Sequence, residues 1–596
     1  MLRSYHAIRV AVALIIFAVP FLISAAPSEV RKHAPQTVNY DAVKDAVILL
    51  INKEMKKHDV IGLSIALVDD QQIVWAQGFG FADEKNNIPA GPDTVYRIGS
   101  LTRLFTATAI MQFVEQGKLD INAPLHSYVP EFSIRSRFAN ARQITLRDLL
   151  THHSGLPSNY QKGMWSRTPE PFMNVLKLIK EEYAAYPPGL MYSDSNIGYA
   201  LLGTVVQMTS GQDFAAYLHD ALLRPLNMAH SGISPAPAKG YYKGKEVEEP
   251  FSRDISAGGL SSTVSDLGRF MQMIIAQGKF GNEQILRPET LKEMLQPQKT
   301  TALDLGMHAG IGWMLSGLGE IDIQNAGIVA HHAGATLFSH SQMIILPAHK
   351  LGVVVLSNSS PSARVVNKAA VEAITRALEA KTGIKQPEQV KFVEKEIPLS
   401  PETQKTFEGF YATSFGVVNI TRDSDHLNAE VMNKTLRLVP VGEGQFGLRY
   451  KFLGLVSINL GELESYPVSR RTVAGREILL VSGRGREMLI GEKIKPMTIS
   501  EAWKNRAGEY VIDNPGNDYP LIEKVRFRFD NGLLIGEYLI PLFADGWFGF
   551  ALEPVSDTEA IMYGLGRGMG ETIKVVVRDG KELLNYSGYV LRKKQD

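Results

Sequence analysis

The 596-residue sequence contains no cysteine. This absence excludes disulfide bonds, thiolate zinc sites, a cysteine nucleophile and a lipid-modified cysteine behind a signal peptide. The sequence also lacks an excess of either charge, since its formal net charge is +1 and no long basic or acidic run occurs. Nothing therefore indicates a nucleic-acid partner, and stability has to come from the burial of apolar side chains.

The apolar run at the N-terminus is short for a membrane span. Arg3 and Arg9 precede the uncharged residues 10–23, and small residues follow at 24–26. These are the three regions of a secretory signal peptide. We expect residues 1–26 to be a signal peptide or an N-terminal anchor. The protein is then exported to the periplasm or the cell exterior and meets a membrane only through that segment.

Ser100 stands at the start of a strongly patterned helix. A turn at Gly99 leads into it, and apolar residues then recur at helical spacing as far as Met111. Arg103 follows by three residues, so its side chain shares a helix face with Ser100. In the S-x-x-K motif of serine acyl-transfer enzymes, a lysine at this spacing takes or relays the proton of the serine. A simple helix N-cap is the alternative interpretation of this stretch taken alone.

Two further loops carry polar residues of interest. His152 and His153 lie in a loop of small and turn-forming residues, without the partners that a metal site needs. We expect them to brace the loop by hydrogen bonds, and we expect no metal and no cofactor. Asp194 and Asn196 directly precede an apolar stretch, which predicts polar side chains held at the N-terminus of a buried helix.

Five segments in order carry a family resemblance. They are RIGSLTRLFTATAIMQFVEQGKLD, ITLRDLLTHHSGLP, PPGLMYSDSNIGYALLG, SAGGLSSTVSDLGRFMQM and HHAGATLFSHSQMIILPAHKLGVVVLSN. Residues from about 40 to 380 resemble the family that joins class C β-lactamases, D-Ala-D-Ala peptidases, esterases and D-aminopeptidases. The resemblance implies an α+β, β-lactamase/transpeptidase-like domain at 36–388, in which helices flank an antiparallel sheet, a helical lobe lies beside it and the site lies between them.

The same resemblance implies roles for single residues. Ser100 matches the family's nucleophile, and its backbone N–H with that of Ala335 matches the oxyanion hole. His332 and Gly334 match the strand motif, where glycine lets a substrate lie along the strand edge. Asn196 matches the asparagine of the family's Tyr-x-Asn motif. Ser100 and His332 are thus candidate catalytic residues, and the other three are candidate substrate-binding residues.

Two catalytic positions depart from the family pattern. Arg103 stands where the family has lysine, and Asp194 stands where it has tyrosine. Aligning Tyr192 instead would shift the loop by two residues. Arginine stays protonated in proteins, so Arg103 cannot act as the base that activates Ser100. Arginine prefers carboxylates, and we therefore predict a salt bridge between Arg103 and Asp194 close to Ser100.

Two functions follow from this pattern. The first is a serine hydrolase that transfers or hydrolyses an amide or ester through Ser100, acting on a peptide, a cell-wall fragment or a small ester. The second is a catalytically silent binding or regulatory homologue of such an enzyme. A further hypothesis joins Ser100, His332 and Asp194 as nucleophile, imidazole and carboxylate, with Arg103 as a structural cation. The oligomeric state cannot be predicted from the sequence.

Short alternating apolar runs replace the helix signals from about residue 398 onwards. We expect two β-rich units, 398–497 and 500–596, because a Gly-x-Tyr segment opens each, at Tyr411 and at Tyr510. They resemble the lipocalin-like β domains that some peptidases and D-aminopeptidases of the family carry.

Two expectations concern how these units are built. Aromatic residues such as Trp547 and Phe548 are expected to fill the core of a barrel, and contact with a ligand is the alternative. A domain boundary also predicts that removing the residues after about Lys385 leaves a foldable catalytic domain.

Overall fold

The computed structural model describes residues 38–595, apart from 234–237, 299, 316–320, 389–399, 424–425, 432–433, 453–455, 459–465, 484–485 and 543–545. The chain divides into two compact units, Met1–Asn39 and Tyr40–Asp596, and all described helices and strands belong to the second. The predicted signal segment lies outside the described residues. Among the helices that are described, none is long and apolar enough to cross a membrane.

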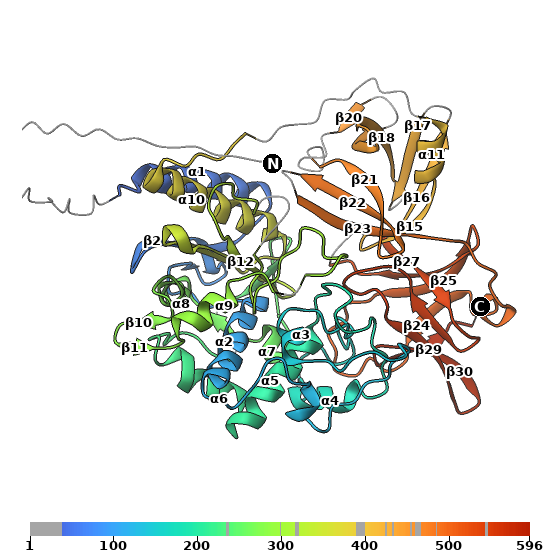
Figure 1. The fold of residues 1–596 in the computed structure, drawn as a ribbon, viewed down its shortest axis with the longest axis horizontal. Helices are drawn as coiled ribbons and strands as arrows, with labels where there is room; N and C mark the ends of the chain where they lie inside the picture. The colour runs from blue at the N-terminus through green and yellow to red at the C-terminus, as the bar shows by residue number, and fades with distance from the viewer. Residues whose placement is uncertain are drawn as a thin grey trace, which may run out of the picture. The chain divides into compact units, whose positions relative to one another are not determined.

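A six-stranded antiparallel sheet organises the first part of the chain, in the order β12-β13-β14-β1-β2-β3. The strands are β1 (Gly62–Asp69), β2 (Gln72–Asp83), β3 (Ile88–Pro89), β12 (Ala330–Ala335), β13 (His340–Leu346) and β14 (Leu351–Ser357). Strands β1 and β14 are buried along nearly their whole length because helices cover both faces of the sheet. Helices α1 (Asp41–Lys57) and α10 (Ala363–Thr382) lie on one face, and α8 (Val264–Ile275) lies on the other (Figure 1).

The helical lobe is built around α2 (Thr102–Glu115), which follows the one-turn 3-10 helix Gly99–Leu101. Helix α2 is buried on nearly all its sides, and it packs against α5 (Asn196–Ser210) and α7 (Ile255–Gly258). The other helices here are α3 (Leu146–Leu150), α4 (Val175–Leu178), α6 (Phe214–Leu218) and α9 (Pro288–Met294). Short strand pairs complete the region: β4 (Tyr96–Arg97) with β9 (Ser261–Ser262), β5 (Trp165–Ser166) with β8 (Phe251–Ser252), β6 (Gly240–Tyr242) with β7 (Lys245–Val247), and β10 (Lys279–Phe280) with β11 (Glu283–Gln284). The predicted sheet with flanking helices and a helical lobe is confirmed.

Two antiparallel, eight-stranded barrels follow, as predicted for lipocalin-like units. The first has the strand order β18-β17-β16-β15-β23-β22-β21-β19 and closes where β18 pairs with β19. The short strand β20 (Val456–Ile458) also pairs with β19. Its strands are β15 (Gly409–Thr413), β16 (Gly416–Asp423), β17 (His426–Val431), β18 (Lys434–Gly442), β19 (Gln445–Phe452), β21 (Val468–Val473), β22 (Arg476–Gly483) and β23 (Arg486–Ile494).

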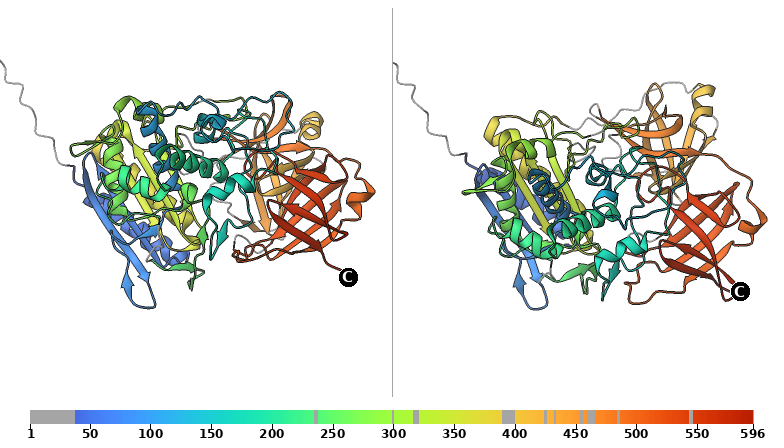
Figure 2. Two further views of the ribbon diagram at one scale, coloured as in Figure 1. Left: turned by 90° about the horizontal axis from the view of Figure 1, so that it is seen from below. Right: turned by 60° about the horizontal axis from the view of Figure 1, so that its bottom comes forward.

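The second barrel closes in simple order from β24 to β31, and its strands, orange-red to dark red, can be followed in Figure 2. They are β24 (Gly508–Ile512), β25 (Lys524–Asp530), β26 (Leu533–Leu539), β27 (Trp547–Pro554), β28 (Glu559–Met562), β29 (Thr572–Arg578), β30 (Lys581–Tyr586) and β31 (Tyr589–Lys593).

The repeated Gly-x-Tyr segments occupy equivalent places in the two barrels. Each follows a short helix, α11 (Pro401–Phe407) or α12 (Glu501–Lys504), and begins the first strand of its barrel. The hydroxyl of Tyr411 donates to the carbonyl of Phe407, and that of Tyr510 donates to the carbonyl of Arg506, both at 2.8 Å. The two units are therefore structural repeats, each fastened by the same tyrosine hydrogen bond across its opening turn.

The expectation for the aromatic pair is corrected. Trp547 and Phe548 are half-buried and do not belong to the fully buried core of the second barrel. The guanidinium of Arg526 lies over the ring of Trp547, 4.1 Å from its centroid. Phe548 stacks on Tyr538 with ring centroids 5.7 Å apart. Alternation along β27 turns these neighbours to opposite faces of the strand, and neither side chain is fully buried.

Both barrels pack on the loop that precedes α5. One buried apolar cluster contains Tyr186 and Met191 from that loop, Ile478 from β22, and Leu565 from the β28–β29 loop, residues 563–571. The predicted boundary near residues 388–398 falls largely in the stretch outside the described residues. That the first domain folds by itself stays a prediction. Deleting the barrels would expose the residues of this apolar cluster that belong to the first domain to water.

Shortening Leu565 should loosen this packing. Leu565 is 5% exposed, so Leu565→Ala removes buried apolar atoms and should lower stability by about 2–5 kcal/mol. Thermal unfolding measures the effect as a lower Tm. Val555→Ala is the control, since Val555 is 47% exposed and should leave Tm nearly unchanged. Equal Tm values for the two variants would show that the cluster does not hold the barrel in place.

Candidate active site

Two glycines bring Ser100 and Ala335 together. Gly99 adopts a φ of +53°, and a Cβ there would lie 2.6 Å from the nitrogen of Ala335. A Cβ on Gly334 would lie 2.0 Å from the carbonyl oxygen of Ile98. Edge strand β12 therefore passes directly beside the turn that carries Ser100, and only glycine permits that approach. Gly334 acts here as a packing residue between the strand and the serine turn.

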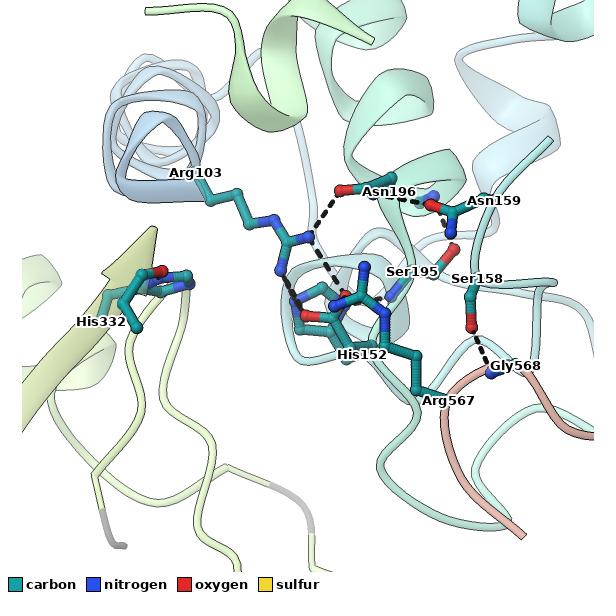
Figure 3. A network of polar contacts seen from close by, with 12 residues as sticks. Arg103, His152, Ser158, Asn159, Ser195, Asn196, His332, Arg567 and Gly568 are labelled. Atoms are coloured by element: carbon teal, nitrogen blue, oxygen red, sulfur yellow. Dashed lines mark hydrogen bonds and ion pairs between the residues drawn. The ribbon is translucent and has the colours of Figure 1, made fainter. Parts of the chain in front are cut away.

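The predicted salt bridge between Arg103 and Asp194 is present. Both terminal nitrogens of Arg103 face the carboxylate, with Nη2 3.2 Å from Oδ1 and Nη1 hydrogen-bonded to Oδ2. Nη2 also donates to Oδ1 of Asn196 at 2.7 Å, and Nδ2 of Asn196 donates to Oδ1 of Asn159 at 2.7 Å (Figure 3). The side chain of Arg103 is only 2% exposed. Asp194, which stands two residues before Asn196, therefore contacts Arg103, the residue at the lysine position of the family pattern.

A second arginine reaches the same carboxylate. Nη1 of Arg567, from the β28–β29 loop, lies 3.1 Å from Oδ1 of Asp194. Burial alone would raise the pKa of Asp194, but the charges of Arg103 and Arg567 outweigh it and hold that pKa well below its usual range. Burial alone would lower the pKa of Arg103, but the charge of Asp194 outweighs burial and raises that pKa. The pair is therefore fully ionised at neutral pH.

His152 and His153 brace the neighbouring loop, as predicted. The N–H of Ser195 donates to Nδ1 of His152 at 3.1 Å. Nε2 of His152 lies 3.2 Å from Nη1 of Arg103 and 3.7 Å from Oδ2 of Asp194. Burial lowers the pKa of His152 to about 3, which keeps the ring neutral. His153 lies 3.0 Å from both Thr151 and the carboxylate of Asp304.

The hypothesis of a Ser100–His332–Asp194 triad is wrong for this structure. Nδ1 of His332 lies 2.7 Å from the carbonyl oxygen of Ala333, and among the described residues no hydrogen bond joins His332 to Asp194. Figure 3 shows His332 on the far side of Arg103 from Asn196. The physical reason is that Arg103 and Arg567 hold the carboxylate of Asp194, so it cannot orient an imidazole. Burial, helped by the charge of Arg103, lowers the pKa of His332 to about 4.

The β28–β29 loop was not predicted to reach the site. Besides Arg567, it supplies the N–H of Gly568, which donates to Oγ of Ser158 at 2.8 Å (Figure 3). Glu571 accepts from the N–H of Ser158 at 3.0 Å and from the hydroxyl of Tyr586 at 2.7 Å. Burial raises the pKa of Glu571. The sequence signal for this contact was the glycine at every second position of Gly564–Gly570, which permits close approach. A Cβ on Gly570 would lie 2.6 Å from the carbonyl oxygen of Ala185.

A cavity of about 760 Å³ opens at Ser100. Asn196, Ala335 and Arg567 also line it. Ser100 is half-buried, and in the part of the chain that the structure describes its hydroxyl has no hydrogen-bond partner. The site thus joins a serine hydroxyl and the strand edge of the predicted oxyanion hole to an ionised Arg–Asp pair, and no described side chain hydrogen-bonds the serine as a base would.

Comparison with known proteins gives consistent similarities. The Beta-lactamase family matches residues 47–376. The putative penicillin-binding protein PbpX of Bacillus subtilis (strain 168) is 30% identical over 258 residues, 41% of this chain and 61% of that protein. Protein flp of Staphylococcus aureus (strain COL) is 25% identical over 328 residues, 52% of this chain and 62% of that protein. The chain therefore spans about three fifths of the length of these relatives.

A solved structure extends the similarity in fold beyond the family region. The octameric penicillin-binding protein homologue from Pyrococcus abyssi has a TM-score of 0.52 and 24% identity, covering 74% of this chain and 99% of that one. This match shows a shared fold alone.

The buried histidines should make the fold sensitive to acid. An unfolded histidine has a pKa of about 6.5, and in the native state those of His152 and His332 are lowered to about 3 and 4. Below pH 6.5 the unfolded chain binds more protons at these sites, so stability should fall steadily as the pH drops towards 4.

The variant His332→Gln should flatten this decline by up to about 3 kcal/mol, measured as Tm against pH from 7.5 to 4.5. His219→Gln is the control because the side chain of His219 is 61% exposed. A His332→Gln variant with the pH slope of the parent would contradict the buried, neutral state of this ring.

Proposed function

Because the chain belongs to the β-lactamase family, which matches it over residues 47–376, we propose that it binds a carbonyl compound in the Ser100 cleft without rapid turnover. The compound is a peptide, a cell-wall fragment or a small ester or amide, the classes on which such a cleft can act. The name of one relative, the putative penicillin-binding protein PbpX, supports a penicillin-like amide as a ligand. The N-terminal sequence supports an exported protein.

The arrangement of Arg103 supports binding over catalysis. Its two terminal nitrogens contact Asp194, Asn196 and His152, and its buried Nε has no hydrogen-bond partner among the described residues. Arginine cannot take a proton at neutral pH, and no other described side chain hydrogen-bonds the hydroxyl of Ser100. A positioned general base contributes about 10²–10⁴-fold to such reactions, so its loss makes acyl transfer slow.

Hydrolysis through Ser100 is the second candidate function. It is favoured by one observation, that Ser100 and Ala335 line the same cavity at the edge of β12. Two backbone N–H groups there would stabilise the oxyanion of an acyl-transfer intermediate. This function requires a base, and no side chain in the described part of the chain hydrogen-bonds Ser100 to act as one.

Restoring the family residues separates the two functions. Arg103→Lys with Asp194→Tyr should raise Ser100-dependent hydrolysis of a small ester by at least about 100-fold, because lysine can lose its proton in this site. The remaining Arg567 should assist, since a nearby positive charge lowers the pKa of a lysine. Each single change should do much less: after Arg103→Lys alone, Asp194 keeps the lysine protonated, and after Asp194→Tyr alone, the buried charge of Arg103 loses its partner.

Ester hydrolysis is measured for the parent, both single variants and the double variant. The matched control adds Ser100→Ala to the double variant and should abolish the gain. If the folded double variant hydrolyses esters no faster than the parent, the Arg–Asp pair is not what keeps the cleft slow.

A further inference from the structure

The cavity at Ser100 extends beyond the sheet-and-helix domain that carries this serine. Besides Ser100, Asn196 and Ala335, it is lined by apolar and aromatic residues of the second barrel. These include Ile512, Val525, Phe527, Phe550, Ile573 and Leu591, and all of them belong to or pack against the barrel core. One continuous space therefore extends from the serine into the interior of the barrel.

The barrel has the size and the lining for a small ligand. An eight-stranded barrel is either filled by its own side chains or leaves room for one small molecule. Here the interior is incompletely filled, because Tyr538, Phe548 and Tyr586 line the cavity and remain half-buried. A cavity of about 760 Å³ falls within the range typical of ligand pockets.

The mouth between barrel and serine is polar and hydrogen-bonded. Ser158 accepts from the N–H of Gly568, and its own N–H donates to Glu571, which also binds Tyr586. Arg567 lines the cavity at this point and is 54% exposed. The space thus has a polar end at Ser100 and an apolar end in the barrel.

We infer that the second barrel is the tail pocket of the cleft: it holds the apolar chain of an amphiphile whose carbonyl end lies at Ser100. This inference rests on the proposed function in so far as a carbonyl compound occupies the serine cleft. The lining favours a hydrocarbon chain over a peptide, because most barrel residues that line the cavity are Ile, Val, Leu or Phe. Of the polar residues there, Glu571 and Tyr586 already hydrogen-bond to each other.

Binding of N-acylglycines of increasing chain length tests the tail pocket. They carry an amide carbonyl, and their carboxylate suits the exposed guanidinium of Arg567. Calorimetry is done on the full-length Ser100→Ala protein, so the result does not depend on whether Ser100 turns substrates over. Affinity should rise by up to about fourfold per methylene from the acetyl to the dodecanoyl compound. Affinity that does not change with chain length overturns the inference, even if the proposed function holds.

Adjacent residues of β24 provide matched variants. Ile512 lines the cavity, whereas Val511 points to the opposite face of the strand. Ile512→Trp should fill the pocket and reduce the affinity for the dodecanoyl compound at least tenfold, without changing that for the acetyl compound. Val511→Trp should change neither.

Ile522→Trp, in the loop before β25, gives a second obstruction if Ile512→Trp fails to fold, since Ile522 lines the same cavity. Dodecanoyl binding that survives a folded obstructing variant would place the chain outside the barrel and overturn the inference. Tighter binding of an unacylated glycine dipeptide than of the dodecanoyl compound would do the same, in favour of a peptide occupant.

Discussion

The ion pair between Arg103 and Asp194 is the constraint on which the rest of the site depends. A buried guanidinium without a carboxylate would be strongly unfavourable, so each partner fixes the other. Asp194 in turn holds Arg567 from the second barrel, and Arg103 holds Asn196 at the start of α5. Arg103 and Asp194 thus form a buried ion pair at the two positions where the family pattern has lysine and tyrosine.

The second barrel is part of the site as well as a neighbour of it. Its β28–β29 loop brings Arg567 to Asp194 and Gly568 to Ser158, and Leu565 of the same loop anchors it in an apolar cluster. Its interior continues the cavity of the serine cleft. A serine cleft that continues into an apolar space in the second barrel favours the holding of a ligand, which is how the two proposals support each other.

The sequence predicted the parts of this arrangement that local patterns encode. The sheet and the helical lobe follow from the family resemblance that five motifs carry. The two β units follow from the repeated Gly-x-Tyr segment, and the Arg103–Asp194 bridge follows from the paired exchange at two positions of the family pattern. The positions of Arg567 and Glu571 could not be predicted, because they depend on how a barrel docks far along the chain. The triad failed for a related reason: sequence shows which groups are present but not that Arg103 and Arg567 capture the carboxylate.

The most direct test of the account is the intact mass of the native protein after incubation with a fluorophosphonate or a penicillin, compared with the Ser100→Ala variant. Both probes form a covalent bond with an activated serine, and the attached mass counts the modified molecules. The account predicts that the native protein gains no more mass than the Ser100→Ala variant during an incubation that fully labels an active serine hydrolase. Stoichiometric addition to the native protein alone would contradict it, because Ser100 would then be activated despite the Arg103–Asp194 pair.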